Sequence, residues 1–365
     1  MALDVLFRAD SSVDIGTGHV MRCLTLADTL RAAGARPRFV CRDLPGHSGV
    51  RIAARGHSVT LLPAPAAGTP AAAAPPDHAG WLAVSQDTDA AQTRDSGTAP
   101  DWIVVDHYAL DARWERAAAA PGTRILATDD LMDRPHAVDL LLDQTLGRRA
   151  SDYAALAPGA RVLAGSDYAL LRPEFAARRA ESLARTRHPV RDILVSLGGI
   201  DGTDATGRVL SVLARTVAGR DMCVTVVMGS AAPHLARIRA QAAAMPVATR
   251  VVVDVDDMAR RMVRSDISIG AAGSTSWERC CLGLPGVIAV LADNQRAIAA
   301  ALAEAGAAGN AGPVSAGFED RLDAVLQDLL SRPRRLAEMG RAAGQVTDGT
   351  GACRVADIMM ESATP

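Results

Sequence analysis

Short apolar runs alternate with amphipathic stretches along most of the chain, and this alternation limits the possible folds more than any other feature of the sequence. Such apolar runs are typical of buried parallel strands, and the helical patterns between most of them are typical of crossover helices. We therefore predict an α/β protein with an open parallel sheet in each half. Strands are predicted at Leu3–Ala9, Arg38–Cys41, Val59–Leu62, Trp102–Val105, Arg124–Ala127, Leu140–Leu142 and Arg161–Ala164 in the first half, and at Ile193–Leu197, Cys223–Val227, Arg250–Val253, Ile267–Ile269 and Val287–Leu291 in the second.

Each half opens with a strand, a Gly-rich loop and a helix, which predicts two Rossmann-like domains that face a cleft. The chain has 365 residues, more than the roughly 250–300 at which a single hydrophobic core stops growing. We place an N-terminal domain at 1–167, an interdomain connection at 168–191 and a C-terminal domain at 192–365. The Ala/Pro-rich segment 63–76 is expected to be a mobile surface insertion.

Composition excludes several classes of function. All 39 residues counted as Lys or Arg are arginine, so a lysine Schiff base and a P-loop lysine are impossible. A net charge of -2 and 3% aromatic residues argue against a nucleic-acid partner. Strand-length apolar runs and the lack of a signal-like N-terminus predict a cytoplasmic protein without membrane spans. The six cysteines form no CxxC pair, so we expect reduced thiols.

His19 stands where a Gly-rich loop is predicted to become a helix. Apolar residues recur at helical spacing from Val20 to Leu30, after the loop that contains Gly16 and Gly18. Those two glycines let the backbone approach a ligand, and the positive end of a helix dipole favours a neutral imidazole. The sequence therefore predicts that His19 is a general base, beside a ligand site that includes Gly16 and Gly18.

A candidate phosphate site lies in the second half, where the strand at Ile267–Ile269 is followed by Gly270, Gly273, Ser274 and Thr275. The free N–H groups and hydroxyls at the start of the next helix can receive a diphosphate, and no metal is required for this. Glu278, about one turn further on, has two interpretations. It could accept hydrogen bonds from the ribose hydroxyls, or it could complete a capping box with Thr275.

Three other groups of residues leave alternatives open, and the remaining histidines do not. Asp106-His107-Tyr108 ends a buried strand, where ligands often bind, but without further context satisfied loop groups are the favoured interpretation of His107 and Tyr108. Asp254-Val255-Asp256-Asp257 resembles a metal-binding DxD, although solvated acids at a helix start are favoured. Asn294 is either a helix cap or an amide that reaches a ligand. Six histidines are expected at the surface: His47, His57, His78, His136, His188 and His234.

A set of short motifs follows in order along nearly the whole chain: Arg8-Ala9-Asp10, Gly16-x-Gly18-His19, Arg22-Cys23, Asp106-His107-Tyr108, Tyr168-x-Leu170-Leu171-Arg172-x-Glu174-Phe175, Ser196-Leu197-Gly198-Gly199, Gly270-Ala271-Ala272-Gly273-Ser274-Thr275-x-Trp277-Glu278 and Asn294-Gln295. Taken in order, these motifs resemble the UDP-2,4-diacetamido-2,4,6-trideoxy-β-L-altropyranose hydrolases of pseudaminic acid biosynthesis. That family resembles the inverting glycosyltransferase that makes lipid II, so the resemblance implies a GT-B-type fold of two Rossmann-like domains, with water as the acceptor.

The resemblance also implies a role for individual residues. The implied roles are a catalytic histidine at His19, residues near the sugar at Tyr108 and Asn294, a diphosphate cradle at Gly273-Ser274-Thr275, a ribose ligand at Glu278 and a uracil-side contact at Met258.

The predicted activity is metal-independent hydrolysis of a UDP-linked diacetamido-trideoxy sugar, by a monomer that needs no cofactor. The C-terminal domain would hold UDP, and His19 would take a proton from water as it attacks the anomeric carbon. Asp10 and Asp14 share the loop before His19, so a double displacement through one of them stays open. The alternatives are an inverting UDP-sugar glycosyltransferase, a hydrolase of a related nucleotide-linked diacetamido sugar and a non-catalytic nucleotide-sugar sensor.

Overall fold

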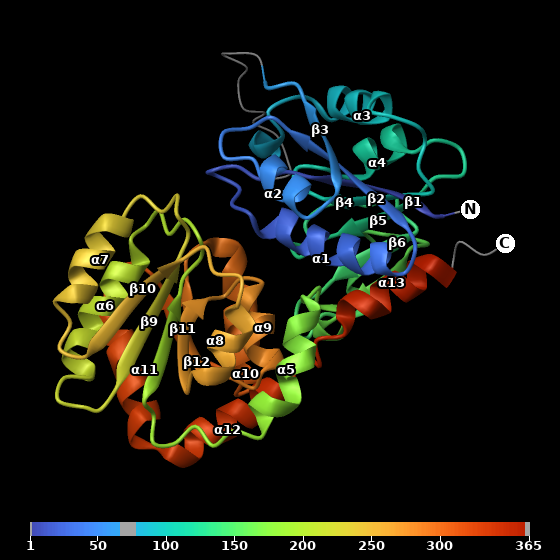
Figure 1. Cartoon of the computed structure of the whole chain (residues 1–365). Coiled ribbons are helices and arrows are strands. Elements are labelled where there is room, and N and C mark those ends of the chain that lie inside the picture. Colours follow the sequence, from blue (N-terminus) through green and yellow to red (C-terminus); the bar gives the residue numbers. More distant parts are fainter. Residues whose placement is uncertain (1, 66–77, 362–365) are drawn as a thin grey trace. The chain divides into compact units, whose positions relative to one another are not determined.

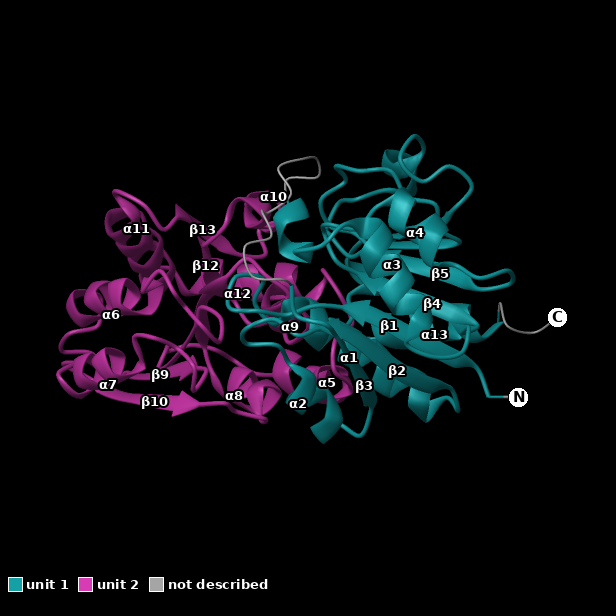
Figure 2. Ribbon diagram, turned by 90° about the horizontal axis from the view of Figure 1, so that it is seen from above, with its two compact units in different colours: residues 1–170, 350–365 teal, residues 171–349 magenta. Residues whose placement is uncertain are grey.

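The computed structural model describes residues 2–65 and 78–361, which form two compact units (Figures 1 and 2). Unit 1 comprises Met1–Leu170 and Thr350–Pro365, and unit 2 comprises Leu171–Gly349. The Ala/Pro-rich segment 63–76, expected to be a mobile insertion, lies mostly outside the described residues.

Unit 1 is built on a seven-stranded sheet in which every neighbouring pair is parallel. Its strands are β1 (Asp4–Ala9), β2 (Arg36–Arg42), β3 (Ser58–Leu62), β4 (Trp102–Asp106), β5 (Arg124–Thr128), β6 (Leu140–Asp143) and β7 (Arg161–Ala164). Its helices are α1 (Gly18–Ala32), α2 (Gly49–Ala54), α3 (Gln86–Asp95), α4 (Ala112–Ala118) and α13 (Gly351–Glu361), with 3₁₀ turns η1 (Ala79–Leu82), η2 (Ala150–Tyr153) and η3 (Ser166–Tyr168). The strand order is β3-β2-β1-β4-β5-β6-β7, so the direction of winding reverses between β1 and β4.

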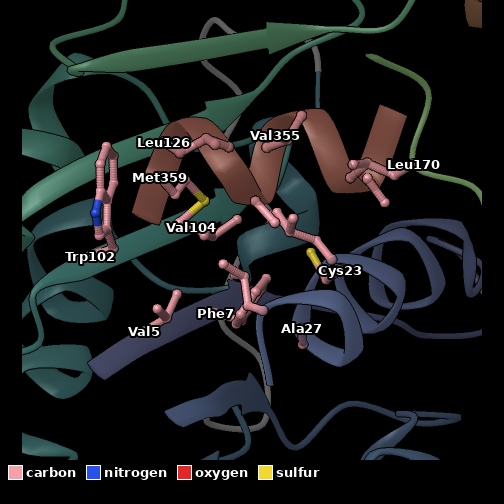
Figure 3. Packing of buried hydrophobic residues seen from close by; sticks show 14 of the residues in the cluster. Val5, Phe7, Cys23, Ala27, Trp102, Val104, Leu126, Leu170, Val355 and Met359 are labelled. Carbon is pink, nitrogen blue, oxygen red and sulfur yellow. The ribbon is translucent and has the colours of Figure 1, made fainter. Parts of the chain in front are cut away.

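Both faces of this sheet are covered, because successive side chains of a strand point to opposite faces. Val5 and Phe7 of β1 pack in one cluster with α1 and with Met359 of α13 (Figure 3). Leu6, between them, belongs to a separate cluster with Trp114 of α4. This double burial explains why the strands are near-continuous apolar runs in the sequence.

Unit 2 repeats the architecture with a six-stranded parallel sheet and helices on both of its faces (Figure 1). Its strands are β8 (Asp192–Ser196), β9 (Cys223–Met228), β10 (Ala248–Val253), β11 (Ile267–Ala271), β12 (Gly286–Val290) and β13 (Gly309–Pro313). Its helices are α5 (Pro173–Leu183), α6 (Ala205–Thr216), α7 (Leu235–Ala243), α8 (Met258–Arg264), α9 (Thr275–Cys281), α10 (Arg296–Glu304), α11 (Phe318–Ser331) and α12 (Pro333–Gly344), with the 3₁₀ turn η4 (Asp293–Gln295). The order β10-β9-β8-β11-β12-β13 places the reversal between β8 and β11.

Every strand predicted from the sequence is present in one of the two sheets. The sequence missed β13, whose residues Gly-Asn-Ala-Gly-Pro are depleted in strands. Proline and glycine are tolerated there because β13 is an edge strand and its pairing with β12 shifts register between Ile288 and Ala289.

The division of the chain differs from the predicted boundaries. The C-terminal domain was predicted to run to residue 365, but α13 belongs to unit 1, because Val355 and Met359 are fully buried in that unit's core (Figure 3). Most of the predicted connection at 168–191 is not a free linker. Its helix α5 is part of unit 2, where Ser182 Oγ donates to the carbonyl oxygen of Leu282 at 2.7 Å.

Among the described residues, no helix combines the length and the apolar character needed to cross a membrane. All six cysteines are free thiols, as expected. Two of the histidines expected at the surface are buried and paired with acids. His57 lies 2.7 Å from Asp28, and His136 lies 2.7 Å from Glu115. The pKa of His136 reaches about 9, because hydrogen bonds and charge from Asp129 and Glu115 outweigh the opposing effect of burial.

Candidate functional site

His19 and Asp106 meet at the point where the sheet of unit 1 reverses its winding. His19 is the second residue of α1, which follows β1, and Asp106 is the last residue of β4, which pairs with β1. In Rossmann-like sheets, ligands bind outside the carboxyl ends of the strands at such a reversal. The order of the strands therefore places both side chains where a ligand is expected.

The two side chains form a close pair. His19 Nδ1 lies 2.6 Å from Asp106 Oδ1, and the Asp106 side chain is completely buried. Burial opposes ionisation of this carboxyl, but Arg22 and His19 outweigh it and hold the pKa of Asp106 well below its usual range. An ionised carboxylate can only accept hydrogen bonds, so Nδ1 carries the proton and Nε2 is the basic nitrogen. In the described part of the chain, Nε2 of His19 makes no hydrogen bond.

Arg22 fixes the orientation of Asp106. It lies three residues after His19 on α1, on the same side of the helix. Its Nε donates to Asp106 Oδ2 at 2.5 Å and its Nη2 donates to Asp106 Oδ1 at 2.7 Å. This bidentate contact is the strongest hydrogen-bonding geometry between an arginine and a carboxylate. Nη1 of Arg22 also contacts Asp130 Oδ2, so one guanidinium links two carboxylates.

Tyr108 lies directly beside the histidine. Its ring centre is 4.6 Å from that of His19, with the two planes at 84°. Its hydroxyl donates to Asp130 Oδ2 at 3.0 Å. Burial and the charge of Asp130 raise the pKa of Tyr108 well above its ordinary value, so the phenol remains a donor. The structure thus brings together two of the predicted site residues, His19 and Tyr108.

The loop before His19 is held by its own hydrogen bonds. Gly16 has φ +77°, a conformation that favours glycine, and its N–H donates to the carbonyl oxygen of Ser12 at 2.9 Å. A Cβ atom added at Gly16 or Gly18 would meet nothing within 4 Å, so the loop has open space on both glycines. The role of these glycines in ligand binding stays a prediction.

Asp10 is not placed to act as a nucleophile. It is fully buried, and its Oδ1 accepts from Arg8 Nη1 at 2.6 Å and from the Arg42 N–H at 2.6 Å. Both oxygens of its carboxylate are engaged, because Arg8 Nη2 donates to Oδ2 at 2.9 Å. His107 is also buried, with its Nδ1 accepting from the Ala109 N–H. The Arg8-Ala9-Asp10 motif and His107 are therefore part of the buried framework.

Sequence reasoning missed the roles of three residues in this cluster. Asp106 was singled out as the end of a buried strand, but the sequence does not show that it faces His19. Arg22 could have been suspected from its i+3 spacing to His19, since such residues are neighbours on a helix. Asp130 follows β5, and no sequence pattern links it to α1 or β4.

The Gly-rich loop of unit 2 lies at that unit's own reversal, after β11. Arg279, which is buried, braces the loop, because its Nη2 donates to the Ala271 carbonyl oxygen at 2.8 Å and to Ser276 Oγ at 2.9 Å. Gly273 has open space where a Cβ would lie. Ser274 is exposed and is the N-cap residue of α9, yet its side chain makes no capping hydrogen bond. Its hydroxyl is therefore available to a ligand.

Glu278 does not complete a capping box. The N-cap residue is Ser274 and not Thr275, so Glu278 is one position too far along α9 for that motif. Its carboxylate instead lies 3.6 Å from Arg172 Nη2, and its side chain is 16% exposed. Burial raises the pKa of Glu278 to about 6, although Arg172 and Arg279 act in the opposite direction. The capping interpretation of Glu278 is wrong, and the ribose interpretation stays a prediction.

Met258 and Asn294 lie apart from these contacts. Met258 is the half-buried first residue of α8, and Asn294 is exposed in η4. Within the residues described, no hydrogen bond or ion pair joins either of them to the Gly273–Thr275 turn or to Glu278. Their roles therefore stay predictions.

The acidic run at 254–257 is engaged in local contacts. Asp254 Oδ1 accepts from the Ser230 N–H at 3.1 Å, and Asp257 Oδ1 accepts from Arg261 Nε at 2.5 Å. Asp257 is the N-cap residue of α8, as the helix-start interpretation expected, but without a capping hydrogen bond from its side chain. In the described ranges, no group of three or more His, Cys, Asp or Glu side chains is arranged to hold a metal ion.

Comparison with known proteins relates the chain to enzymes of sugar metabolism. No protein-family model matches it. It is 30% identical over 202 residues to the spore coat polysaccharide biosynthesis protein SpsG of Bacillus subtilis, which covers 55% of this chain and 58% of that protein. It is 26% identical over 306 residues to the UDP-2,4-diacetamido-2,4,6-trideoxy-β-L-altropyranose hydrolase of Campylobacter jejuni, which covers 83% of this chain and 97% of that protein.

Among solved structures, MurG of Acinetobacter baumannii superposes with a TM-score of 0.70 and 16% sequence identity, over 98% of this chain and 99% of MurG. The chain has the GT-B fold. The predicted fold class is therefore confirmed: two Rossmann-like α/β units, each with an open parallel sheet. At this level of identity the superposition establishes the architecture, and the activity has to be argued from the residues of the site.

Proposed function

We propose that this chain is a nucleotide-sugar hydrolase that transfers the sugar of a UDP-linked diacetamido-trideoxy sugar to water. The observation that carries the proposal is the His19–Asp106 pair, which leaves Nε2 of His19 as a basic nitrogen without a partner among the described residues. The similarity to the altropyranose hydrolase of Campylobacter jejuni, which extends over most of both chains, supports this substrate.

The proposed reaction begins with the base in unit 1. Nε2 of His19 takes a proton from water as the water oxygen attacks the anomeric carbon. Asp106 stabilises the imidazolium that forms and holds the ring in the required tautomer. Arg22 keeps Asp106 ionised and oriented throughout, because it donates to both carboxylate oxygens. Tyr108, beside the His19 ring, is proposed to contact the sugar together with Gly16 and Gly18.

Unit 2 is proposed to hold the nucleotide. The Gly273–Thr275 turn would receive the diphosphate through backbone N–H groups and the exposed Ser274 hydroxyl. Glu278 would accept hydrogen bonds from the ribose, Met258 would lie near the uracil and Asn294 near the sugar. As the bond to the sugar breaks, charge develops on UDP, and these fixed donors stabilise it without a metal ion.

The arrangement favours a single displacement at carbon. A covalent sugar intermediate needs a free carboxylate, and Asp10 is locked in ion pairs with Arg8. Asp14 is exposed, and no described contact joins it to His19. A single attack by water from the face opposite UDP would invert the anomeric centre.

A second candidate is an inverting glycosyltransferase, because the chain is also 33% identical over 178 residues, 47% of its length, to an N-acetylglucosamine transferase of Xylella fastidiosa. The same base could deprotonate an acceptor hydroxyl instead of water. The decisive experiment incubates the purified chain with the UDP-sugar and no acceptor and follows UDP release. Steady multiple turnover supports the hydrolase, and release that depends on an added acceptor supports the transferase. Mass spectrometry of the products from a panel of UDP- and CMP-linked diacetamido sugars then identifies the sugar that is accepted.

A further inference from the structure

Aromatic side chains gather around the proposed base. Trp81, in η1, stacks on Tyr108 with ring centres 5.8 Å apart and an angle of 26° between the planes. His78 contacts both rings, at 4.6 Å from Trp81 and 5.3 Å from Tyr108. The ring of His19 stands edge-on to this group, 6.1 Å from Trp81. We call Trp81, Tyr108 and His78 the aromatic wall. In a chain with 3% aromatic residues, such a grouping beside one histidine requires a physical reason.

Trp81 differs from the other tryptophans of the chain. Trp102, Trp114 and Trp277 are at most 2% exposed and fill hydrophobic cores, whereas Trp81 is half-buried. Trp114 Nε1 donates to Asp89 Oδ1 at 2.9 Å, and the indole N–H of Trp81 donates to no residue of the described chain. Trp102 Nε1 also lacks a partner there, but it is buried in the core, so partial exposure is what distinguishes Trp81. A half-buried tryptophan with an unused donor can present both its ring and its N–H to a ligand.

We propose that Trp81 binds an acetamido group of the sugar. Its ring would pack on the acetyl methyl group, and its Nε1–H would donate to the acetamido carbonyl oxygen. This inference rests on the proposed function and deepens it, because it assigns the recognition of an N-acetylated sugar to a residue that the sequence motifs do not include. Trp81 is a binding residue in this account, and His19 remains the base.

The charges beside the aromatic wall favour an amide group of the ligand over a phosphate group as the partner of the Trp81 N–H. The carboxylates of Asp106 and Asp130 lie next to His19 and Tyr108, and the guanidinium of Arg22 is shared between them. Arg134, whose guanidinium lies 5.7 Å from the Tyr108 ring, is itself paired with Asp129 and Asp133. A negatively charged phosphate would find no free cation among the described residues around the wall, whereas a neutral carbonyl oxygen needs only the indole N–H.

Fluorescence can report on Trp81 directly, because the other three tryptophans are buried. The experiment measures acrylamide quenching of the full-length protein with two free sugars as probes. One is 2,4-diacetamido-2,4,6-trideoxyaltrose, and the other is 6-deoxyaltrose, which has no acetamido group. We expect the first sugar to protect the fluorescence from acrylamide and the second to give no protection at the same concentration. Trp81→Phe should remove most of the quenchable signal, which verifies its source.

Calorimetry with the same sugars tests the hydrogen bond. Trp81→Phe keeps an aromatic ring and removes the N–H, so affinity for the diacetamido sugar should fall by about 3- to 10-fold, the range for one neutral hydrogen bond. Trp81→Ala, which also removes the ring, should weaken binding further. UDP affinity should be unchanged in both variants. Val50→Ala is the matched control, because Val50 is an exposed side chain of the same unit, 82% accessible.

Three results would overturn the inference. They are equal affinity of the wild-type protein for the two sugars, unchanged affinity of Trp81→Phe for the diacetamido sugar, and no protection of Trp81 by that sugar. Because these assays measure binding of the free sugar, they are independent of turnover. A wild-type protein that binds the sugar at Trp81 but releases no UDP from the UDP-sugar contradicts the proposed hydrolysis and leaves this inference standing.

Discussion

The substitution Asp106→Asn tests the proposed base most sharply, because it changes the partner of His19 and leaves His19 itself in place. Asn has one acceptor oxygen where Asp has two, and Arg22 donates to both oxygens of Asp106. If the amide oxygen accepts from Arg22, the amide NH2 faces His19 and donates to Nδ1, which moves the imidazole proton to Nε2. The nitrogen that faces the water would then no longer be basic. We expect kcat to fall by roughly 10²–10⁴, the contribution of a positioned general base.

The structure gives the scale of the effect. Asp106 Oδ1 lies 2.6 Å from His19 Nδ1, and Arg22 Nη2 lies 3.4 Å from the same nitrogen. With an effective dielectric constant of about 20, the carboxylate attracts the imidazolium by about 6 kcal/mol and the guanidinium repels it by about 5 kcal/mol. Replacing Asp106 removes the attraction and leaves the repulsion, so about 6 kcal/mol, or roughly 10⁴ in rate, is the upper limit.

The assay is UDP release from the UDP-sugar at neutral pH, with UDP affinity measured separately by calorimetry. UDP should bind the variant normally, since its proposed ligands lie in unit 2. Asp266→Asn is the matched control, because Asp266 is a buried carboxylate like Asp106 but lies in the other unit, at the amino end of β11. There it accepts hydrogen bonds from two backbone N–H groups. Near-normal kcat in Asp106→Asn, with the fold intact by circular dichroism, would refute the dyad reasoning.

Three further predictions concern the base, the ribose contact and the phosphate site. His19→Ala should lower kcat by roughly 10²–10⁴ with UDP binding retained. His19→Asn should lower kcat at least as much, and near-normal kcat in either variant would mean that His19 is not the base. Glu278→Gln should weaken uridine binding by about 1.5–3 kcal/mol, the range for hydrogen bonds to a charged group. Because the pKa of Glu278 is raised to about 6, the ionised acceptor is lost as pH falls through 6, so wild-type affinity for uridine should drop there and that of Glu278→Gln should not. Turnover should persist in EDTA. If EDTA instead abolishes activity and Mg²⁺ or Mn²⁺ restores it, Asp254 and Asp256 become the candidate metal ligands.

The choice of uridine for the pH experiment is deliberate. The phosphates of UDP titrate close to pH 6 themselves, which would hide the titration of Glu278. Uridine carries no phosphate, so a pH-dependent affinity that disappears in Glu278→Gln reports on this carboxyl group alone. A wild-type affinity that stays constant between pH 7 and pH 5 would contradict the assignment of Glu278 as the ribose ligand.

The sheets were predictable because the signal for a doubly covered parallel strand is local. Val5, Leu6 and Phe7 are all apolar because each faces a helix layer, on one side of the sheet or the other. The same logic could not find β13, whose Gly-Asn-Ala-Gly-Pro sequence is tolerated only because it lies at a sheet edge. Nor could it assign α13 to unit 1, since an amphipathic helix does not encode which of two similar cores it covers.

The candidate site was predictable only in part, for a related reason. The glycines and His19 predict a loop that is followed by a helix, and this pattern lies within one continuous segment of the sequence. The partners of His19 come from other segments, because Asp106 ends β4 and Trp81 lies in η1. Glu278 shows the opposite case, in which a convincing local motif failed because α9 begins one residue earlier than the capping box requires.

The central claim is that water, activated by His19, attacks the anomeric carbon of a UDP-sugar. Hydrolysis in ¹⁸O-labelled water tests it most directly, with mass spectrometry of both products and NMR of the sugar before mutarotation. The account predicts that the label enters the sugar and not UDP, and that the inverted anomer forms first. Label in UDP would show attack at phosphorus, and an initially retained anomer would show a covalent intermediate; either result would contradict the mechanism.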